Sequence, residues 1–290
     1  MTNPRPDLSI ITAVYQGRKY IASCIESVID QRYDAVEHII IDGGSTDGTI
    51  EIVTSYLQKY PHIRFISEKD KGQSDALNKG IKLAQSKIIG ILNVDDFYEP
   101  DVFKNINDYF SKLNEPALLV GNCNRLGEDG KIIAVNKPQK LRQIDLLLGW
   151  SINEIPCNPS AYFYHRSLHE KIGYYDETDH YSMDVRFILN AVAAAHVLYV
   201  DKCWGNYRYI PGAKTYEDIK TGGNKERVAL LLESYIKKLP WYERCWVRIL
   251  KHHKIAYFYY RIGYYLKDPI TRIGNTLQKY SKSSKNENQK

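Results

Sequence analysis

The sequence predicts an α/β protein built on a doubly wound, mainly parallel sheet with helices on both faces. Short runs rich in Ile and Val alternate with longer segments in which apolar residues recur every three or four positions. Runs such as Ile39-Ile40-Ile41 are unbroken by polar side chains, which is typical of strands buried on both faces. With 43% hydrophobic and 26% charged residues, the 290-residue chain has the balance of a globular protein with a sizeable core.

The first part of the chain repeats this alternation of strand and helix. We expect strands at residues 8–14, 36–41, 63–67 and 87–92, and helices at 19–30, 47–59, 74–84 and 101–113. The repeat weakens after residue 113. There we expect strands at 117–120 and 196–200, a hairpin turn at Glu128-Asp129-Gly130, and helices at 141–148, 183–195 and 226–237.

Charge divides the chain into a near-neutral body and a basic end. Residues 241–290 hold eleven Lys and Arg against three Asp and Glu, which leaves 29 basic and 31 acidic residues in 1–240. We therefore expect one domain over 1–220, with halves at 1–115 and 116–220, and a basic, aromatic helical extension at 221–280. Residues 281–290 contain no apolar side chain and are expected to be disordered.

The cysteines and the N-terminal segment argue against secretion. The five cysteines are widely scattered and form no Cys-x-x-Cys pair, so we expect reduced packing residues rather than a zinc or redox site. The apolar run after Asp7 is too short for the core of a signal peptide. We therefore expect a cytoplasmic protein.

Polar residues follow each of the first four predicted strands. Because ligands of open α/β sheets bind beyond the carboxyl ends of the strands, we expect these segments to converge on one rim. Any one of them alone is more often a turn or a helix cap than a binding loop. The chain has neither G-x-G-x-x-G nor G-x-x-x-x-G-K-[ST], so neither a dinucleotide site nor a P-loop is indicated. The segments are Thr12 with Tyr15, Asp42 to Gly48, Glu68 to Gly72, and Asn93 to Asp96.

The adjacent acids Asp95 and Asp96 are the most informative of these residues. Two carboxylates at the end of an apolar strand repel each other unless a cation or a set of donors compensates. Mg²⁺ and Mn²⁺ prefer oxygen ligands and often join one or two carboxylates to substrate phosphates. The alternative is that the pair only caps the helix that begins near Pro100.

In their order along the chain, these segments resemble the inverting family-two glycosyltransferases of the GT-A fold. The resemblance is strong over residues 7–105, continues more loosely to about Thr215, and rests on four blocks. They are Ser9 to Tyr15, Ile41 to Thr49, Ser67 to Gly72 with Ala76 to Gly80, and Leu92 to Asp96. It implies a nucleotide-sugar-binding half at 1–115, an acceptor half at 116–220, and a bacterial polysaccharide-building enzyme.

The resemblance also implies roles for individual residues. Thr12, Tyr15 and Asp42 would hold the nucleoside, with Lys71 nearby. Asp95 would face the ribose or the sugar, and Asp96 would bind a divalent metal, Mn²⁺ or Mg²⁺. The donor implied is a nucleotide sugar, with a uridine nucleotide as the default.

A carboxylate on a later helix serves as the general base in this family, and Asp184 matches its position. Many members carry Glu before that Asp, whereas this chain has Met183. Displacement at an anomeric carbon with inversion requires deprotonation of the acceptor hydroxyl opposite the leaving diphosphate, so the chemistry also asks for such a base. The alternative is a helix residue paired with Arg186 or another surface base.

Two further segments resemble parts of the family's acceptor side. Asn158 and Ser160 would help to shape the acceptor site. In a late loop that often reads Arg-x-His, Ile210 occupies the histidine position, so this chain lacks that imidazole there. Arg208 and Lys214 are candidates to meet the diphosphate, with simple solvation as the equal alternative.

Residues 241–280 combine many Trp and Tyr residues with basic side chains. This mixture favours either peripheral contact with the inner face of a membrane or a helical extension packed on the catalytic domain. Basic residues interrupt its apolar runs well short of the ~20 residues that span a bilayer. No nucleic-acid-binding motif accompanies it.

The leading hypothesis is a metal-assisted, inverting transfer of a hexosyl or N-acetylhexosaminyl group from a nucleotide-diphosphate donor. The acceptor would be a hydroxyl of a glycan or lipid-linked glycan. One alternative is a sugar nucleotidyltransferase, although its usual basic, glycine-rich phosphate loop near the N-terminus is absent here. The other is a catalytically silent partner in glycan assembly.

Overall fold

The computed structural model describes residues 5–252 and divides the chain into two compact units, with the division between Tyr235 and Ile236. The larger unit thus extends beyond residue 220, where the sequence predicts the catalytic domain to end. The predicted disordered tail at 281–290 lies outside the described residues, as does the predicted extension after residue 252.

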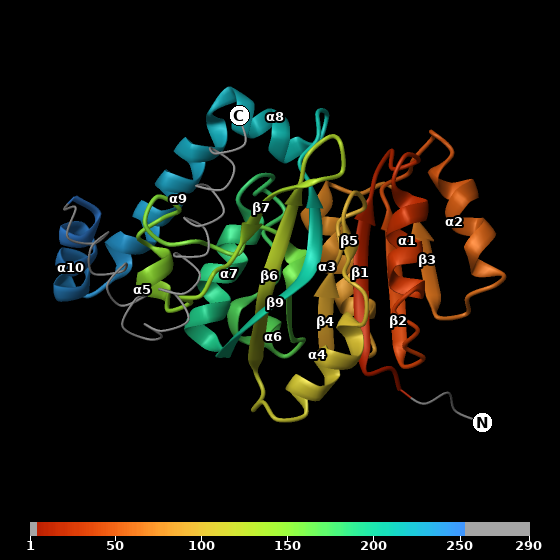
Figure 1. Ribbon diagram of the computed structural model, residues 1–290, viewed down its shortest axis with the longest axis horizontal. Coiled ribbons are helices and arrows are strands. Elements are labelled where there is room, and N and C mark those ends of the chain that lie inside the picture. The colour runs from red at the N-terminus through yellow and green to blue at the C-terminus, as the bar shows by residue number, and fades with distance from the viewer. Residues whose placement is uncertain (1–4, 253–290) are drawn as a thin grey trace, which may run out of the picture. The chain divides into compact units, whose positions relative to one another are not determined.

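The larger unit contains a nine-stranded sheet in the order β3-β2-β1-β4-β8-β6-β9-β5, with β7 paired to β6. The strands are β1 (Leu8–Val14), β2 (Val36–Asp42), β3 (Ile63–Ser67), β4 (Ile88–Ile91), β5 (Phe97–Tyr98), β6 (Ala117–Leu126), β7 (Ile132–Asn136), β8 (Tyr162–His165) and β9 (His196–Arg208). The parallel prediction is confirmed for β3-β2-β1-β4, drawn red to orange in Figure 1. Beyond β4 the sheet is mixed, because β8 runs antiparallel to β4 and β6 while β9 runs parallel to β6.

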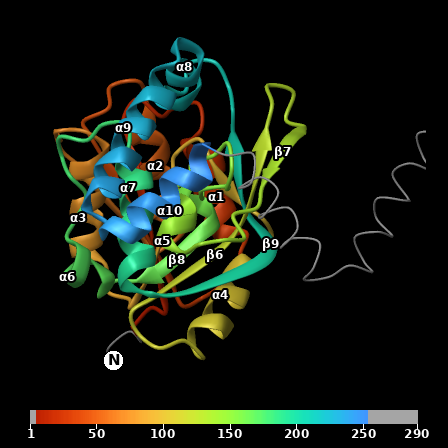
Figure 2. The same ribbon diagram turned by 90° about the vertical axis from the view of Figure 1, so that its left-hand side faces the viewer.

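Helices cover both faces of this sheet, as a doubly wound fold requires. The helices up to residue 238 are α1 (Ile21–Ile29), α2 (Thr49–Leu57), α3 (Gln73–Leu83), α4 (Val102–Phe110), α5 (Gln143–Leu146), α6 (Leu168–Ile172), α7 (Met183–Ala194), α8 (Lys214–Thr221) and α9 (Gly223–Lys238), with the 3₁₀ helix η1 (Pro159–Ala161) before β8. Figure 2 shows α3, α6 and α7 on one side of the sheet and α1 and α4 on the other. The second unit contains α10 (Trp241–His252).

Close packing of the sheet against its helices explains two glycines. The fully buried rings of Phe103, Phe163 and Trp204 pack with Ile10 between α4 and the sheet. A Cβ atom at Gly90 of β4 would lie 2.6 Å from the ring of Phe163 and 2.8 Å from Ile10. On the opposite face, a Cβ atom at Gly80 of α3 would lie 2.4 Å from Ile11. Both glycines therefore allow a separation between elements that any side chain would prevent.

None of the helices described between residues 5 and 252 has the length and apolar character needed to cross a membrane.

His38 is a fully buried polar residue on β2, and it makes stability depend on pH. Its imidazole is fully buried and bonds through Nε2 to the hydroxyl of Thr12 at 2.9 Å. Burial, with a smaller contribution from His62, lowers the pKa of His38 from 6.5 to about 3. Between these two values the unfolded chain binds a proton that the folded chain excludes, so stability is lost as pH falls below 6.5.

We expect the free energy of unfolding to fall by about 2 kcal/mol more in the wild type than in His38→Gln between pH 7 and pH 5. Urea denaturation over this pH range measures the difference. The exposed His196 offers a control, since His196→Gln should keep the wild-type slope. Equal slopes for His38→Gln and the wild type would contradict a neutral, buried His38.

Candidate active site

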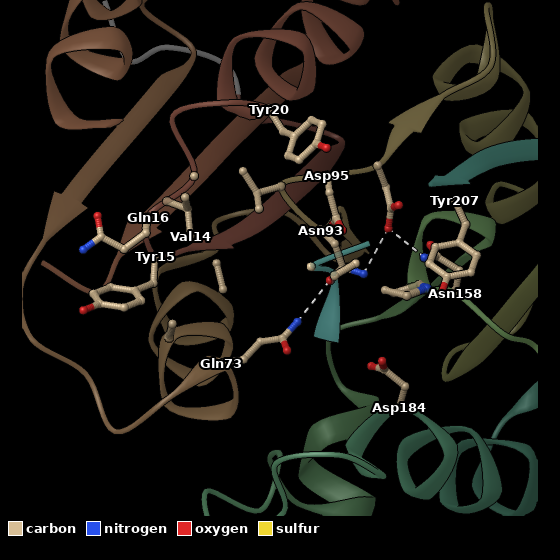
Figure 3. A pocket seen from close by; sticks show the side chains of 18 of the residues that line it. Val14, Tyr15, Gln16, Tyr20, Gln73, Asn93, Asp95, Asn158, Asp184 and Tyr207 are labelled. Carbon is tan, nitrogen blue, oxygen red and sulfur yellow. Dashed lines mark hydrogen bonds between the residues drawn. The ribbon is translucent and has the colours of Figure 1, made fainter. Parts of the chain in front are cut away.

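A cavity of about 770 Å³ lies at the carboxyl ends of β1 and β4, where the sequence predicts the polar segments to converge. The rest of its wall comes from the start of α3 with the loop before it, the loop before η1, the first turn of α7, the loop after β9, and α8. In Figure 3, Tyr15 lies toward one end and Asp184 toward the other, with Asp95 between them. Of the seven site residues that the sequence predicts, Tyr15, Asp95, Asp96 and Asp184 line this cavity.

The carboxylate of Asp96 is fully buried in the cavity wall and is held by three donors. Its Oδ2 accepts a hydrogen bond from the amide of Asn158 at 2.7 Å and another from the amide of Asn93 at 3.1 Å. Its Oδ1 receives only a longer contact, 3.3 Å, from the backbone N–H of Arg208. The three donors belong to three segments that lie far apart in the sequence, so all three must assemble before this carboxylate can be buried.

Asn158 is itself fixed in orientation. It caps η1, and its Oδ1 accepts from the backbone N–H of Ser160 at 2.9 Å and from the hydroxyl of Ser160 at 2.6 Å. Because two donors occupy the amide oxygen, the amide nitrogen is the atom that faces Asp96. Ser160 therefore orients Asn158, which in turn holds Asp96, while a role of these two residues in the acceptor site stays a prediction.

Burial raises the pKa values of both members of the acidic pair. Burial, and then the neighbouring charge of Asp95, raise the pKa of Asp96 well above its ordinary value. Burial also raises the pKa of Asp95, against an opposing effect of the guanidinium of Arg208. A cation at this place would stabilise both ionised carboxylates.

Arg208 is not simply solvated, and its contact with a diphosphate stays a prediction. Its guanidinium lies 4.5 Å from the ring centroid of Phe97 and donates to the backbone carbonyl of Asp95. Together with the contact from its backbone N–H to Asp96, this clamps the turn after β4 against the end of β9. The structure does not describe the side chain of Lys214, the other basic candidate.

The loop after β2 holds one carboxylate oxygen of Asp42 through several hydrogen bonds. Asp42 is fully buried, and its Oδ2 accepts from the backbone N–H groups of Gly44 and Ser45, both at 3.0 Å, and from the hydroxyl of Ser67 at 2.6 Å. Its Oδ1 has no hydrogen-bond partner within the part of the chain that the structure describes. An unpaired buried acceptor is costly, which suits an atom that receives a donor from a ligand.

Three predicted binding residues do not line the cavity. Asp42 lies beneath its own loop, and Thr12 is fully buried with its hydroxyl bonded to His38. Lys71 is largely exposed, and its ammonium group bonds to Glu177 at 2.9 Å. Direct contact of these three residues with a nucleoside stays a prediction.

Asp184 lies in the first turn of α7, across the cavity from the acidic pair (Figure 3). Burial raises the pKa values of three phenols on β8 and the loop after α6, and the charge of Asp184 adds to that rise. These phenols belong to Tyr162, Tyr164 and Tyr175. The guanidinium of Arg186, which the sequence offers as a partner of Asp184, bonds to Asp179 at 2.9 Å.

Several lining residues were not expected from the sequence. Gln73 donates to the side-chain oxygen of Asn93 at 3.1 Å. It thereby orients the amide of Asn93, which donates to Asp96. Asp70 and His180 also line the cavity. His180 occupies a loop that none of the four family blocks covers and where periodicity carries no signal, whereas Asp70 belongs to the segment Glu68 to Gly72 that was expected on this rim.

A comparison of the sequence with models of known families identifies the family of this chain. The model of "Glycosyl transferase family 2" matches residues 9–173, more than half of the chain, and the match covers every strand end that lines the cavity except β9. The chain belongs to this family. The resemblance drawn from the four strand-end blocks is thereby confirmed.

Known relatives and solved structures of glycosyltransferases support this assignment. A "Chondroitin synthase" of Escherichia coli is 36% identical over 129 residues, which make up 44% of this chain and 19% of that protein. The crystal structure of S. aureus TarS 1-349 in complex with UDP-GlcNAc has a TM-score of 0.58 at 17% identity and covers 71% of this chain and 59% of that one. The mannosyltransferase PcManGT from Pyrobaculum calidifontis, in complex with GDP-Man and Mn2+, has a TM-score of 0.53 at 17% identity and covers 76% of this chain and 61% of that one.

These comparisons confirm the GT-A fold, with a curled, mixed sheet and C-terminal helices. The chain spans less than two thirds of each of these three proteins. The family-two glycosyltransferase assignment therefore rests on the matched domain.

Asn158→Ala should lower the free energy of unfolding by about 1.5–3 kcal/mol, because it removes a hydrogen bond to a buried carboxylate. Chemical denaturation at neutral pH measures the change. Asn105→Ala is the matched control, since the amide of Asn105 donates to a backbone carbonyl on the exposed surface of α4. If both variants lost the same stability, the amide of Asn158 would not be holding Asp96.

Proposed function

We propose that this family-two glycosyltransferase moves a sugar from a nucleotide-diphosphate donor, by default a UDP-sugar, to a hydroxyl of a glycan or lipid-linked glycan with inversion. The observation that carries the proposal is one cavity with an acidic pair on one wall and the carboxylate of Asp184 on the opposite wall. The likeness to a chain in complex with UDP-GlcNAc and to a polysaccharide synthase supports the choice of donor and acceptor. Polysaccharide assembly is the proposed setting.

The cavity offers the two ends of a donor different chemistry. The exposed ring of Tyr15 can stack on a base, and the unpaired Oδ1 of Asp42 can accept a hydrogen bond from a base imide once the loop adjusts to a nucleotide. Asp95, half-buried and turned to the cavity, can bond hydroxyls of the ribose or the sugar. The diphosphate then lies beside the acidic pair.

The acidic pair fits a divalent cation, with Asp96 as the proposed ligand. Its Oδ2 is occupied by two amide donors, which orient the carboxylate, while its Oδ1 has only the longer backbone contact. In residues 5–252 no cluster of three or more His, Cys, Asp or Glu forms a ready-made metal site. Mg²⁺ and Mn²⁺ take one or two carboxylates and complete their ligands with phosphate oxygens and water, so the proposed site would be completed by the donor. When bound, the ion would neutralise charge on the departing diphosphate.

Asp184 is the proposed general base. It would accept the proton of the acceptor hydroxyl while that oxygen bonds to the anomeric carbon and the bond from this carbon to the diphosphate breaks. Attack from the wall opposite the leaving group inverts the anomeric configuration. The charge of Asp184 adds to the rise in the pKa of the buried phenols of Tyr162 and Tyr175, so the carboxylate lies close to these side chains of the core.

Asp184→Asn should lower kcat for sugar transfer by about 100-fold or more and leave donor affinity within a few-fold of the wild type. Release of nucleoside diphosphate and calorimetric titration with the donor measure the two quantities. The exposed Asp129 of the β6–β7 hairpin provides the control, and Asp129→Asn should turn over normally. Normal turnover of Asp184→Asn would remove it as the base, and release of pyrophosphate instead of nucleoside diphosphate would favour a nucleotidyltransferase.

Adding UDP together with Mn²⁺ should raise Tm by about 5 °C more than UDP alone at saturating concentrations. Asp96→Asn should lose most of this increment, and chelation of the metal should abolish transfer by the wild type. Asp101→Asn serves as the control at an exposed acid outside the cavity. A Tm shift with UDP that is independent of Mn²⁺ in the wild type would rule out the metal.

A further inference from the structure

The second unit presents a helix with three distinct faces. At ~100° per residue, the side chains of α10 separate into sectors around its axis. Val247 and Leu250 form a buried sector, with exposed fractions of 0% and 3%. The remaining apolar side chains form a broad exposed sector that consists of Trp241, Tyr242, Trp246 and Ile249, with exposed fractions of 71%, 58%, 48% and 48%.

The basic side chains of α10 form the third sector, next to the exposed apolar one. Arg244, Arg248 and Lys251 recur at intervals of four and three residues, so they line up along one edge of the helix. The acid Glu243 falls on the side of the buried sector instead. The exposed apolar sector thus forms a strip that runs beside a row of positively charged side chains.

The side chains of the exposed strip are of the kind that enters a lipid interface. Tyr and Trp combine an apolar ring with a polar tip, and they concentrate where hydrocarbon meets water. Exposed contiguous apolar patches mark sites of interaction with other surfaces. Long basic side chains can lie along such a strip and keep their charges in the headgroup region.

The charge of the chain indicates which kind of surface the exposed side of α10 would contact. From residue 241 to the end of the sequence, eleven Lys and Arg face three Asp and Glu, whereas the rest of the chain is near neutral. A second copy of this chain would bring the same positive charge to the contact and oppose it. An anionic lipid surface complements it and also accepts the aromatic strip.

We propose that α10 docks this glycosyltransferase onto an anionic lipid surface, with Trp241, Tyr242, Trp246 and Ile249 entering the interface and the basic edge contacting headgroups. The helix lies on the surface, since basic residues interrupt the apolar runs of residues 241–280 well short of the ~20 residues that span a bilayer. Docking is independent of sugar transfer, so either property can fail without the other.

The test is co-sedimentation of the full chain with vesicles of phosphatidylcholine alone or with about one third phosphatidylglycerol. We expect the wild type to bind the anionic vesicles at least about tenfold more tightly, and to be released by high salt. Tyr242→Ser combined with Trp246→Ser should lower binding to anionic vesicles at least about tenfold. Arg248→Gln combined with Lys251→Gln should lower it to a similar extent.

Matched controls use exposed residues of the same kinds in the other unit. Ile132→Ser with Ile133→Ser removes exposed apolar side chains of β7, and Lys104→Gln with Lys112→Gln removes two exposed charges at α4. Both controls should bind vesicles as the wild type does. Equal binding to neutral and anionic vesicles, or undiminished binding by the α10 variants, would overturn the proposal. So would a concentration-dependent dimer, measured by light scattering, that these α10 variants abolish while vesicle binding stays absent.

Discussion

The arrangement of the active site depends on one buried carboxylate, that of Asp96. A buried carboxylate is tolerated only where donors or cations compensate its charge, and here the donors come from Asn93, Asn158 and the backbone of Arg208. The turn after β4, the loop before η1 and the end of β9 therefore have to meet at one point. This requirement links the parallel and the mixed parts of the sheet, and it fixes where the cavity opens between them.

The parallel half of the sheet was predictable because its signals are local. Each of the first four strands is an apolar run followed by a helix with a clear period, and such alternating units form a parallel sheet. The mixed half depends on pairing between distant segments. Residues 162–165 form β8 between β4 and β6, but four aromatic and polar residues after a proline do not differ locally from a loop. For β9, the five apolar-rich residues 196–200 predict the strand, whereas its continuation to Arg208 is determined by pairing with β6.

The site was predictable in position but not in the direction of each side chain. The ends of strands converge as expected, so Tyr15, Asp95 and Asp96 line one cavity. Thr12 comes from the same strand end, yet alternation along β1 turns it to the face that carries Ile10, under α1, where it bonds to His38. Lys71 follows a loop whose course ends in an ion pair with Glu177, a partner about a hundred residues away that no local pattern reveals.

The place of Ile210 shows how the same constraint bears on the chemistry. Resemblance to the family raises the question of what replaces a histidine there, and the structure gives Ile210 a place in the cavity wall directly after the clamp formed by Arg208. With its Oδ2 bound by two amides, Asp96 is oriented without that imidazole, so loss of the histidine leaves the carboxylate in position. What the imidazole would have added is one more ligand or donor toward the diphosphate. The imidazole that lines this cavity is that of His180, and it comes from the loop before α7, on the side of Asp184, rather than from the end of β9.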